Sequence, residues 1–126
     1  MNKMPEAMEH YWAMWNELDL DLVRGHLDQA VSDDFLFADP INFHQGRDAL
    51  EANVREFRAD RPTAGFALAS RLDSHNRRYR YEWNLIEDGE VTLRGFDVTT
   101  LSDDGLIERI DGFFGPLRPL RRKAED

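Results

Sequence analysis

The chain has 126 residues, no cysteine and a formal net charge of -9. A chain of this length is near the usual size of one domain, and it can bury roughly two-thirds of its unfolded surface without a disulfide or a metal. The absence of cysteine excludes disulfide scaffolds, thiolate zinc sites and cysteine nucleophiles. The balance of 25 Asp plus Glu against 16 Lys plus Arg disfavours nucleic acid and anionic lipid as partners.

The sequence also gives expectations about location and domain organisation. No stretch approaches the roughly twenty apolar residues of a membrane span. Residues 1–9 carry two glutamates, where a signal peptide would be apolar. We therefore expect a soluble, cytoplasmic protein with no membrane partner, organised as one domain over residues 1–126. Basic side chains between Arg118 and Lys123 fall in an expected flexible C-terminal tail that starts at about residue 117.

Apolar side chains at helical spacing predict three helices. The first covers residues 4–18, and the second covers about 21–30 with Asp19 or Asp21 as its N-cap. The third opens at Gly46 and stops at Arg61-Pro62, because the residue before a proline disfavours helical geometry. The apolar stripe of the first helix consists of Met4, Met8, Tyr11, Trp15 and Leu18.

The apolar period then changes to alternation, which indicates strands buried on one face. Strands are expected over 66–72 and 79–85 and, after an Asp88-Gly89 turn, over 91–101 and 106–114. Earlier in the chain, short strands are expected around Phe35 and Phe43, separated by Pro40. Helices followed by a long antiparallel meander imply an α+β fold, in which the helices cover one face of a curved sheet and leave a cone-shaped cavity.

Four segments carry a resemblance to a known superfamily. They are Tyr11 with Trp15, Asp39-Pro40 ahead of Gly46, Gly95-Phe96-Asp97-Val98, and Gly105-Leu106-Ile107 leading into Gly112-Phe113-Phe114-Gly115. In their order and spacing the chain resembles the nuclear transport factor 2-like superfamily, in particular its SnoaL-like and ketosteroid isomerase-like bacterial members, across almost its whole length. The resemblance implies a cone-shaped, curved, mixed or antiparallel sheet packed against N-terminal helices, a cystatin-like roll.

The resemblance to the isomerase branch also implies roles for single residues. That branch uses an aspartate base, with a tyrosine and a protonated aspartic acid as oxyanion donors and no cofactor. Asp39, Tyr11 and Asp97 map to those three catalytic roles. The residues expected to bind the substrate are Trp15, His44, Phe57, Tyr81, Trp83 and Phe114.

Each catalytic candidate also has a purely structural interpretation. Asp39 lies between Phe37 and Pro40, where apolar surroundings would raise its pKa, yet it could equally be a turn aspartate that caps the following backbone. Tyr11 could be an ordinary core tyrosine with a satisfied hydroxyl. His44 could be a surface residue, and no ligand spacing supports a metal site, so no metal is expected.

The environment of Asp97 depends on the register of the Asp88-Gly89 hairpin. A two-residue turn would put Asp97 opposite Arg80, as an ordinary salt-bridge partner. A three-residue loop with a bulge at Gly89 would set it opposite Tyr79 and inside the cavity, where it could serve as a proton donor. The second register is favoured, because it places the aromatic residues of the preceding strand on the same face as Leu93.

Two classes of function follow. The leading hypothesis is a cofactor-independent isomerase or polyketide cyclase-like enzyme that moves a proton on a small hydrophobic carbonyl compound. An epoxide hydrolase is weaker, because the paired Arg and Asp it uses are not evident around Arg94 and Asp97. The alternative is a non-catalytic ligand-binding or assembly module. We also expect a homodimer through the outer face of the sheet, around Phe96, Val98 and Phe113.

Overall fold

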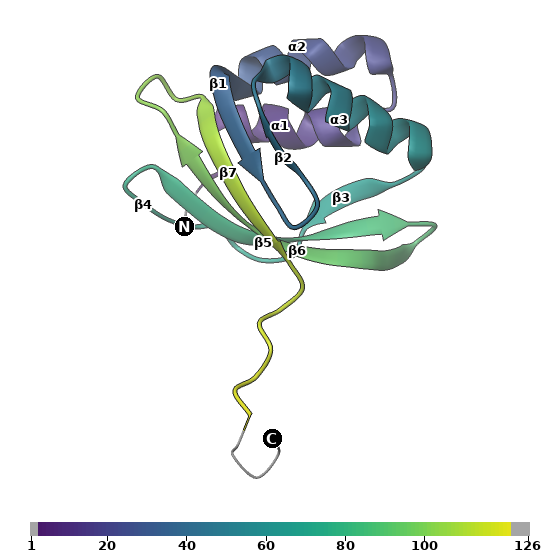
Figure 1. Cartoon of the computed structure of the whole chain (residues 1–126), viewed down its shortest axis with the longest axis vertical. Coiled ribbons are helices and arrows are strands. Elements are labelled where there is room, and N and C mark those ends of the chain that lie inside the picture. Colours follow the sequence, from purple (N-terminus) through teal and green to yellow (C-terminus); the bar gives the residue numbers. More distant parts are fainter. Residues whose placement is uncertain (1–2, 122–126) are drawn as a thin grey trace.

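The computed structural model describes residues 3–121, and its three helices lie together on one side of a curved sheet (Figure 1). The predicted fold class is confirmed: within this part of the chain the helices pack on a seven-stranded mixed sheet that does not close into a barrel. In chain order the elements are α1 (Glu6–Asn16), α2 (Leu20–Ala30), β1 (Val31–Ala38), β2 (Phe43–Gln45), α3 (Arg47–Asp60), β3 (Gly65–Leu68), β4 (Asp73–His75), β5 (Arg78–Glu87), β6 (Glu90–Leu101) and β7 (Ile107–Phe114).

The sheet is mixed because one of its pairings is parallel. Its strand order is β2-β1-β7-β6-β5-β3, and β4 pairs with β5 beside this path. The last strand, β7, pairs with β1 in parallel and with β6 in antiparallel orientation. The β5–β6 hairpin has the two longest strands of the sheet, and its inward face carries side chains that are buried in the core.

The helix boundaries follow from local capping. Helix α1 is shorter than predicted: the carbonyl of Pro5 accepts the first backbone N–H bonds, and Glu17 at the C-cap is extended. Leu18 therefore lies outside the helix, and 67% of it is exposed. Helix α2 begins after Asp19, whose carboxylate accepts a hydrogen bond from the backbone N–H of Asp21 at 2.9 Å. Of the two residues predicted as the N-cap, Asp19 and Asp21, the structure therefore has Asp19 in that position.

The strand predicted over residues 66–72 is in fact interrupted. Strand β3 ends at Leu68 because Ser70 competes for the backbone of the neighbouring strand. The Ser70 hydroxyl accepts the backbone N–H of Glu82 at 2.8 Å, and the carbonyl of Glu82 accepts the N–H of Ala69 at 2.8 Å. A side chain that replaces a ladder bond in this way ends regular pairing.

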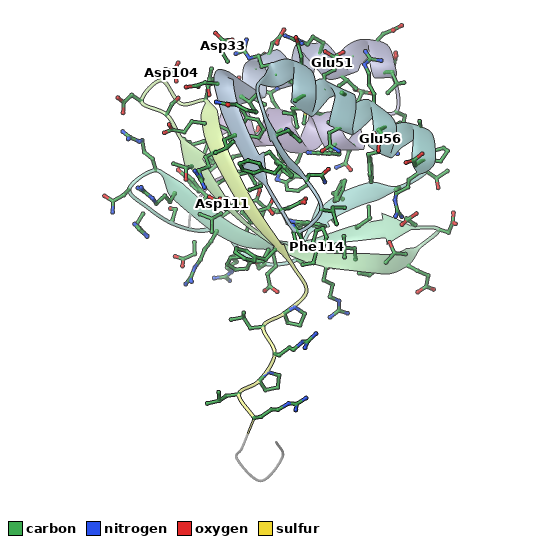
Figure 2. The ribbon with its side chains drawn as sticks, viewed as in Figure 1. Asp33, Glu51, Glu56, Asp104, Asp111 and Phe114 are labelled. Atoms are coloured by element: carbon green, nitrogen blue, oxygen red, sulfur yellow. The ribbon has the colours of Figure 1, made fainter. Side chains whose placement is uncertain are left out.

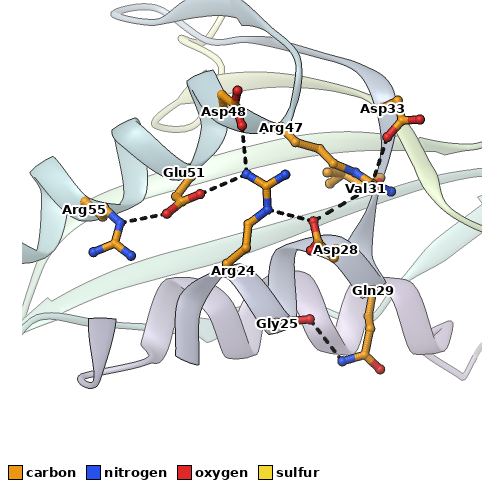
Figure 3. A network of polar contacts seen from close by, with 10 residues as sticks. All are labelled: Arg24, Gly25, Asp28, Gln29, Val31, Asp33, Arg47, Asp48, Glu51 and Arg55. Atoms are coloured by element: carbon orange, nitrogen blue, oxygen red, sulfur yellow. Dashed lines mark hydrogen bonds and ion pairs between the residues drawn. The ribbon is translucent and has the colours of Figure 1, made fainter. Parts of the chain in front are cut away.

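A network of charged side chains joins α2 to α3 (Figure 3). The Arg24 guanidinium contacts Asp48 at 2.8 Å, Glu51 at 2.9 Å and Asp28 at 2.9 Å. Arg24 first, and then Arg55, lowers the pKa of the Glu51 carboxyl. These side chains are partly or almost fully exposed, so each ion pair adds little to the stability of the fold.

The C-terminal region extends beyond the sheet. Residues 116–121 have no regular secondary structure and run away from the helices and sheet (Figure 1). Residues 122–126 of the predicted tail lie outside the described residues. None of the helices within residues 3–121 has the length and apolar character needed to cross a membrane.

Candidate active site

A cavity of about 290 Å³ lies between α1, α3, the loop after β1 and the inner face of the sheet. Seven of the predicted site residues line it: Tyr11, Trp15, Asp39, Phe57, Trp83, Asp97 and Phe114. The lining also includes Glu56 on α3. Figure 2 labels both Glu56 and Phe114, the last residue of β7. Aromatic side chains form the largest group in this lining, and polar side chains converge among them, as is typical of a small-molecule site.

The three predicted catalytic residues meet near Gly112, where β6 and the end of β1 bring Asp97 and Asp39 to either side of β7. Gly112 pairs with Asp97 across the β6–β7 ladder. A Cβ atom on Gly112 would lie 2.8 Å from Asp97 Oδ1 and 3.4 Å from Asp39 Cβ. The glycine therefore makes room for the Asp97 carboxyl, with Asp39 on its other side. Tyr11 reaches the same region from α1, where it is buried with 2% exposure.

Asp39 has the turn role that one of its two interpretations predicts. Its Oδ1 accepts the backbone N–H groups of Ile41 at 2.9 Å and Asn42 at 2.7 Å, and its own N–H donates to the Asn42 carbonyl at 2.9 Å. It is therefore an Asx-type turn residue that also lines the cavity. These bonds fix the orientation of the carboxylate at the end of β1.

The hairpin register differs from both alternatives. The turn has two residues, with Asp88 and Gly89 at φ 51 and 80, but Thr92 is an extra residue in β6 that shifts the ladder by one position. Asp97 therefore lies opposite Tyr81, not opposite Arg80 or Tyr79. Like other bulges, this one changes which residues face each other while keeping the hairpin intact.

The shifted register buries Asp97 on the inner face, with 5% exposure. Burial, which disfavours the charged form, raises the pKa of Asp97 to about 7, and the nearby Asp39 carboxylate adds to the rise. The indole N–H of Trp83 faces this carboxyl and offsets part of the effect. The two groups do not meet the geometry of a hydrogen bond, so the Trp83 N–H is a buried donor without a partner among the described residues. Near neutral pH, Asp97 can thus exist as a carboxylic acid that donates a hydrogen bond.

Tyr11 is held as a neutral phenol. Burial raises the pKa of Tyr11 well above its ordinary value, and the Asp97 carboxyl and the Tyr81 hydroxyl add to this rise. The adjacent Trp15 side chain offsets part of it. A neutral phenol in an apolar site is a strong hydrogen-bond donor toward a developing negative charge.

Two predicted substrate-binding residues do not reach the cavity lining. The Tyr81 hydroxyl lies behind it, accepts the indole N–H of Trp12 at 3.0 Å and lies 3.3 Å from the Thr99 hydroxyl. The His44 ring stacks on Phe37, with centroids 5.1 Å apart and planes at 9°. The pairing of β2 with β1, in which His44 stands opposite Phe37, directs the ring to that position. Within residues 3–121, His, Asp and Glu side chains form no group of three or more that could hold a metal ion.

Comparison with known proteins identifies the family. Residues 8–110 match the SnoaL-like domain. The chain belongs to the SnoaL-like family. No curated protein matches it significantly. Among solved structures, a proposed isomerase of the SnoaL-like family from Agrobacterium tumefaciens is 31% identical, with a TM-score of 0.82 over 87% of this chain and 95% of that one.

More distant structures share the fold. A nuclear transport factor 2-like protein of unknown function from Exiguobacterium is 19% identical, with a TM-score of 0.72 over 88% of this chain and 99% of that one. A proposed SnoaL-like polyketide cyclase from Jannaschia is 13% identical, with a TM-score of 0.66 over 90% of each chain. The family match and these structures together establish the SnoaL-like fold of this chain.

Sequence reasoning missed several residues that line this SnoaL-like cavity. Trp12 lies beside Tyr11 on α1 and was outside the narrow predicted stripe, although the apolar face of a globular helix is wide enough to include it. Phe66 was assigned to a strand without a role in the site. The remaining lining residues are Phe37, Ile41, Asn42, Asn53, Glu56, Asp60, Arg61, Leu85 and Leu93.

Proposed function

We propose that this SnoaL-like protein is a cofactor-independent enzyme that moves a proton next to the carbonyl group of a small hydrophobic compound. The observation that carries the proposal is the convergence of Tyr11, Asp39 and Asp97 on one aromatic-walled cavity. A base and two neutral donors around one point suit the removal of a proton from carbon, because negative charge develops on the carbonyl oxygen as the proton leaves.

Asp39 is the proposed base. Its Oδ1 is occupied by the two backbone N–H groups of the turn, while Oδ2 has no hydrogen-bond donor among the described residues. Oδ2 would take the proton from the carbon next to the carbonyl and return it to the same or another carbon. The turn supports this role because it holds the carboxylate in one orientation, which reduces the entropy lost in reaching the substrate.

Tyr11 and Asp97 are the proposed oxyanion donors. Both are buried and favour their protonated forms, so each could donate a hydrogen bond to the oxygen of an enolate. The aromatic side chains of Trp15 and Phe57 would exclude water and hold the apolar part of the substrate. The epoxide hydrolase alternative has no such support, because Arg94 is exposed on the opposite face of β6 from Asp97.

One observation favours the non-catalytic alternative, a ligand-binding or assembly module. Both backbone N–H groups that bond to Asp39 Oδ1 belong to the turn that Asp39 itself begins. A carboxylate held this way could serve the turn alone. In that case the cavity would bind a carbonyl compound and leave it unchanged.

Exchange of carbon-bound protons for deuterium in a simple ketone distinguishes the enzyme from the non-catalytic module. In D₂O the protein would exchange the protons next to the carbonyl of 2-tetralone for deuterium, and proton NMR would follow the loss of signal. We expect catalysis by the wild type and at least a 100-fold loss in Asp39→Asn. Asp34→Asn, which changes an exposed carboxylate on β1, the strand that leads to Asp39, is the matched control and should retain full activity. Binding of 2-tetralone without exchange would assign the module function instead.

A further inference from the structure

Trp83 carries a polar group that the roles assigned above do not use. Its side chain lines the cavity and is only 8% exposed. The indole Nε1–H is fully buried and has no hydrogen-bond partner among the described residues. A buried donor without a partner is unfavourable, because it has lost water and gained nothing in return.

The other two indoles of the chain behave differently. Trp12 donates its N–H to the Tyr81 hydroxyl at 3.0 Å, and this hydroxyl lies 3.3 Å from Thr99 Oγ1. Trp15 lies beside Tyr11, and its contact favours the ionised form of that phenol. Of the three tryptophans, only Trp83 has a buried N–H without an acceptor in the described part of the chain.

The position of the Trp83 ring is fixed by the strand beneath it. Trp83 pairs with Gly95, and a Cβ atom at Gly95 would lie 2.0 Å from ring atom Cζ2 and 2.1 Å from Cε2. Cε2 is bonded to Nε1, so the nitrogen-bearing side of the indole rests directly on the glycine. The Phe66 ring packs edge-on with centroids 5.3 Å apart, and the Phe114 ring does so at 6.5 Å. These contacts prevent the ring from turning its N–H toward another acceptor.

The N–H is held near Asp97, which follows Gly95 by two residues on the same face of β6. It faces the Asp97 carboxyl but falls outside hydrogen-bond geometry. A protonated Asp97 uses its own proton as a donor, so two donors are directed at one region of the cavity. An acceptor atom placed between them would satisfy both.

We propose that the indole N–H of Trp83 is a further hydrogen-bond donor to the ligand oxygen, so that the cavity selects compounds with a carbonyl or enol oxygen over hydrocarbons of the same shape. This inference rests on the proposed function, because it assumes a ligand whose oxygen reaches Asp97. It gives a specificity-determining hydrogen bond to Trp83, a residue that the sequence analysis expects only to bind the substrate.

The test uses two probes of nearly equal shape, 2-tetralone with its carbonyl and tetralin without one. Three tryptophans give three indole signals in a proton–nitrogen correlation spectrum, and the signal that disappears in Trp83→Phe identifies Trp83. We expect 2-tetralone to shift that signal downfield and tetralin to leave it near its free position. Calorimetry should show Trp83→Phe binding 2-tetralone about tenfold more weakly, with tetralin affinity changed less than about threefold.

Several outcomes would overturn the inference. One is binding of 2-tetralone with no downfield shift of the Trp83 indole, and another is equal weakening of both probes in Trp83→Phe. No response to 2-tetralone up to its solubility limit would also do so. The spectrum of the wild type decides the question even where Trp83→Phe fails to fold, since Trp12→Phe and Trp15→Phe identify the other two signals. Proton exchange at 2-tetralone is measured separately, so a protein that binds without exchange contradicts the enzyme proposal and leaves the role of Trp83 standing.

Discussion

Replacing Asp97 with asparagine should change how the stability of the protein depends on pH. Burial raises the pKa of Asp97 to about 7 in the folded chain, whereas an unfolded chain has an aspartate pKa of roughly 4. Between these values the folded state binds the proton and the unfolded state does not. The contribution of Asp97 to the free energy of unfolding therefore falls as pH rises from about 4 to about 7, and then levels off.

The size of the effect follows from the same two pKa values. A difference of about three in pKa corresponds to about 4 kcal/mol, at 1.36 kcal/mol each. This is an upper limit, because water that enters the cavity would solvate the ionised carboxylate. Asp97→Asn does not titrate, so its unfolding free energy should lack this fall. Relative to the wild type, the variant should gain up to about 4 kcal/mol between pH 4 and pH 8.

Urea unfolding at pH 4.5, 6 and 8, followed by far-ultraviolet circular dichroism, would measure this gain. Glu82→Gln is the matched control, because Glu82 is an exposed carboxylate on the adjacent strand and neighbours Tyr81 in sequence. Its difference from the wild type should stay constant across the series. A difference between Asp97→Asn and the wild type that varies by less than about 1 kcal/mol would refute a neutral, buried Asp97.

Two further predictions concern the sheet. Gly112→Ala should destabilise the protein by about 1–3 kcal/mol and weaken 2-tetralone binding, because the new Cβ would approach Asp97 Oδ1 to 2.8 Å. Unchanged urea unfolding together with unchanged affinity would contradict the packing around Gly112. The outer face should form a homodimer through Phe96 and Phe113, which pair across β6 and β7 and of which Phe113 is 62% exposed. Light scattering at micromolar concentration should give twice the chain mass, and Phe113→Ser should give a monomer; a monomeric wild type would exclude this interface.

The sequence determines the arrangement of the elements through local signals. Asp19, one of the two residues predicted as the N-cap of α2, caps that helix. The alternating pattern that includes Tyr81 and Trp83 predicts that both lie on the inner face of β5, where they are buried. The helical spacing of Tyr11 and Trp15 predicts that both lie on the buried face of α1, and both are buried in the structure. These features depend on near neighbours in the chain, which is why periodicity and capping rules find them.

The parts that sequence could not predict depend on pairing between strands. The extra residue Thr92 has no glycine or proline to mark a bulge, so the register of Asp97 follows only from the whole β5–β6 ladder. The orientation of His44 is set by its partner Phe37 in β1. Tyr81 faces inward as expected, but its hydroxyl is used by Trp12, a contact between residues 69 positions apart.

A crystal structure with 2-naphthol bound would test the central claim most directly, since this compound has the shape and the hydroxyl group of the enol of 2-tetralone. We predict that the oxygen of 2-naphthol lies about 2.5–3.2 Å from both the Tyr11 hydroxyl and the Asp97 carboxyl. Its rings would pack between the aromatic side chains of the cavity, with Asp39 beside the carbon next to the oxygen. A complex with the rings in the cavity but the oxygen turned toward Glu56 and Arg61, away from Tyr11 and Asp97, would contradict this prediction.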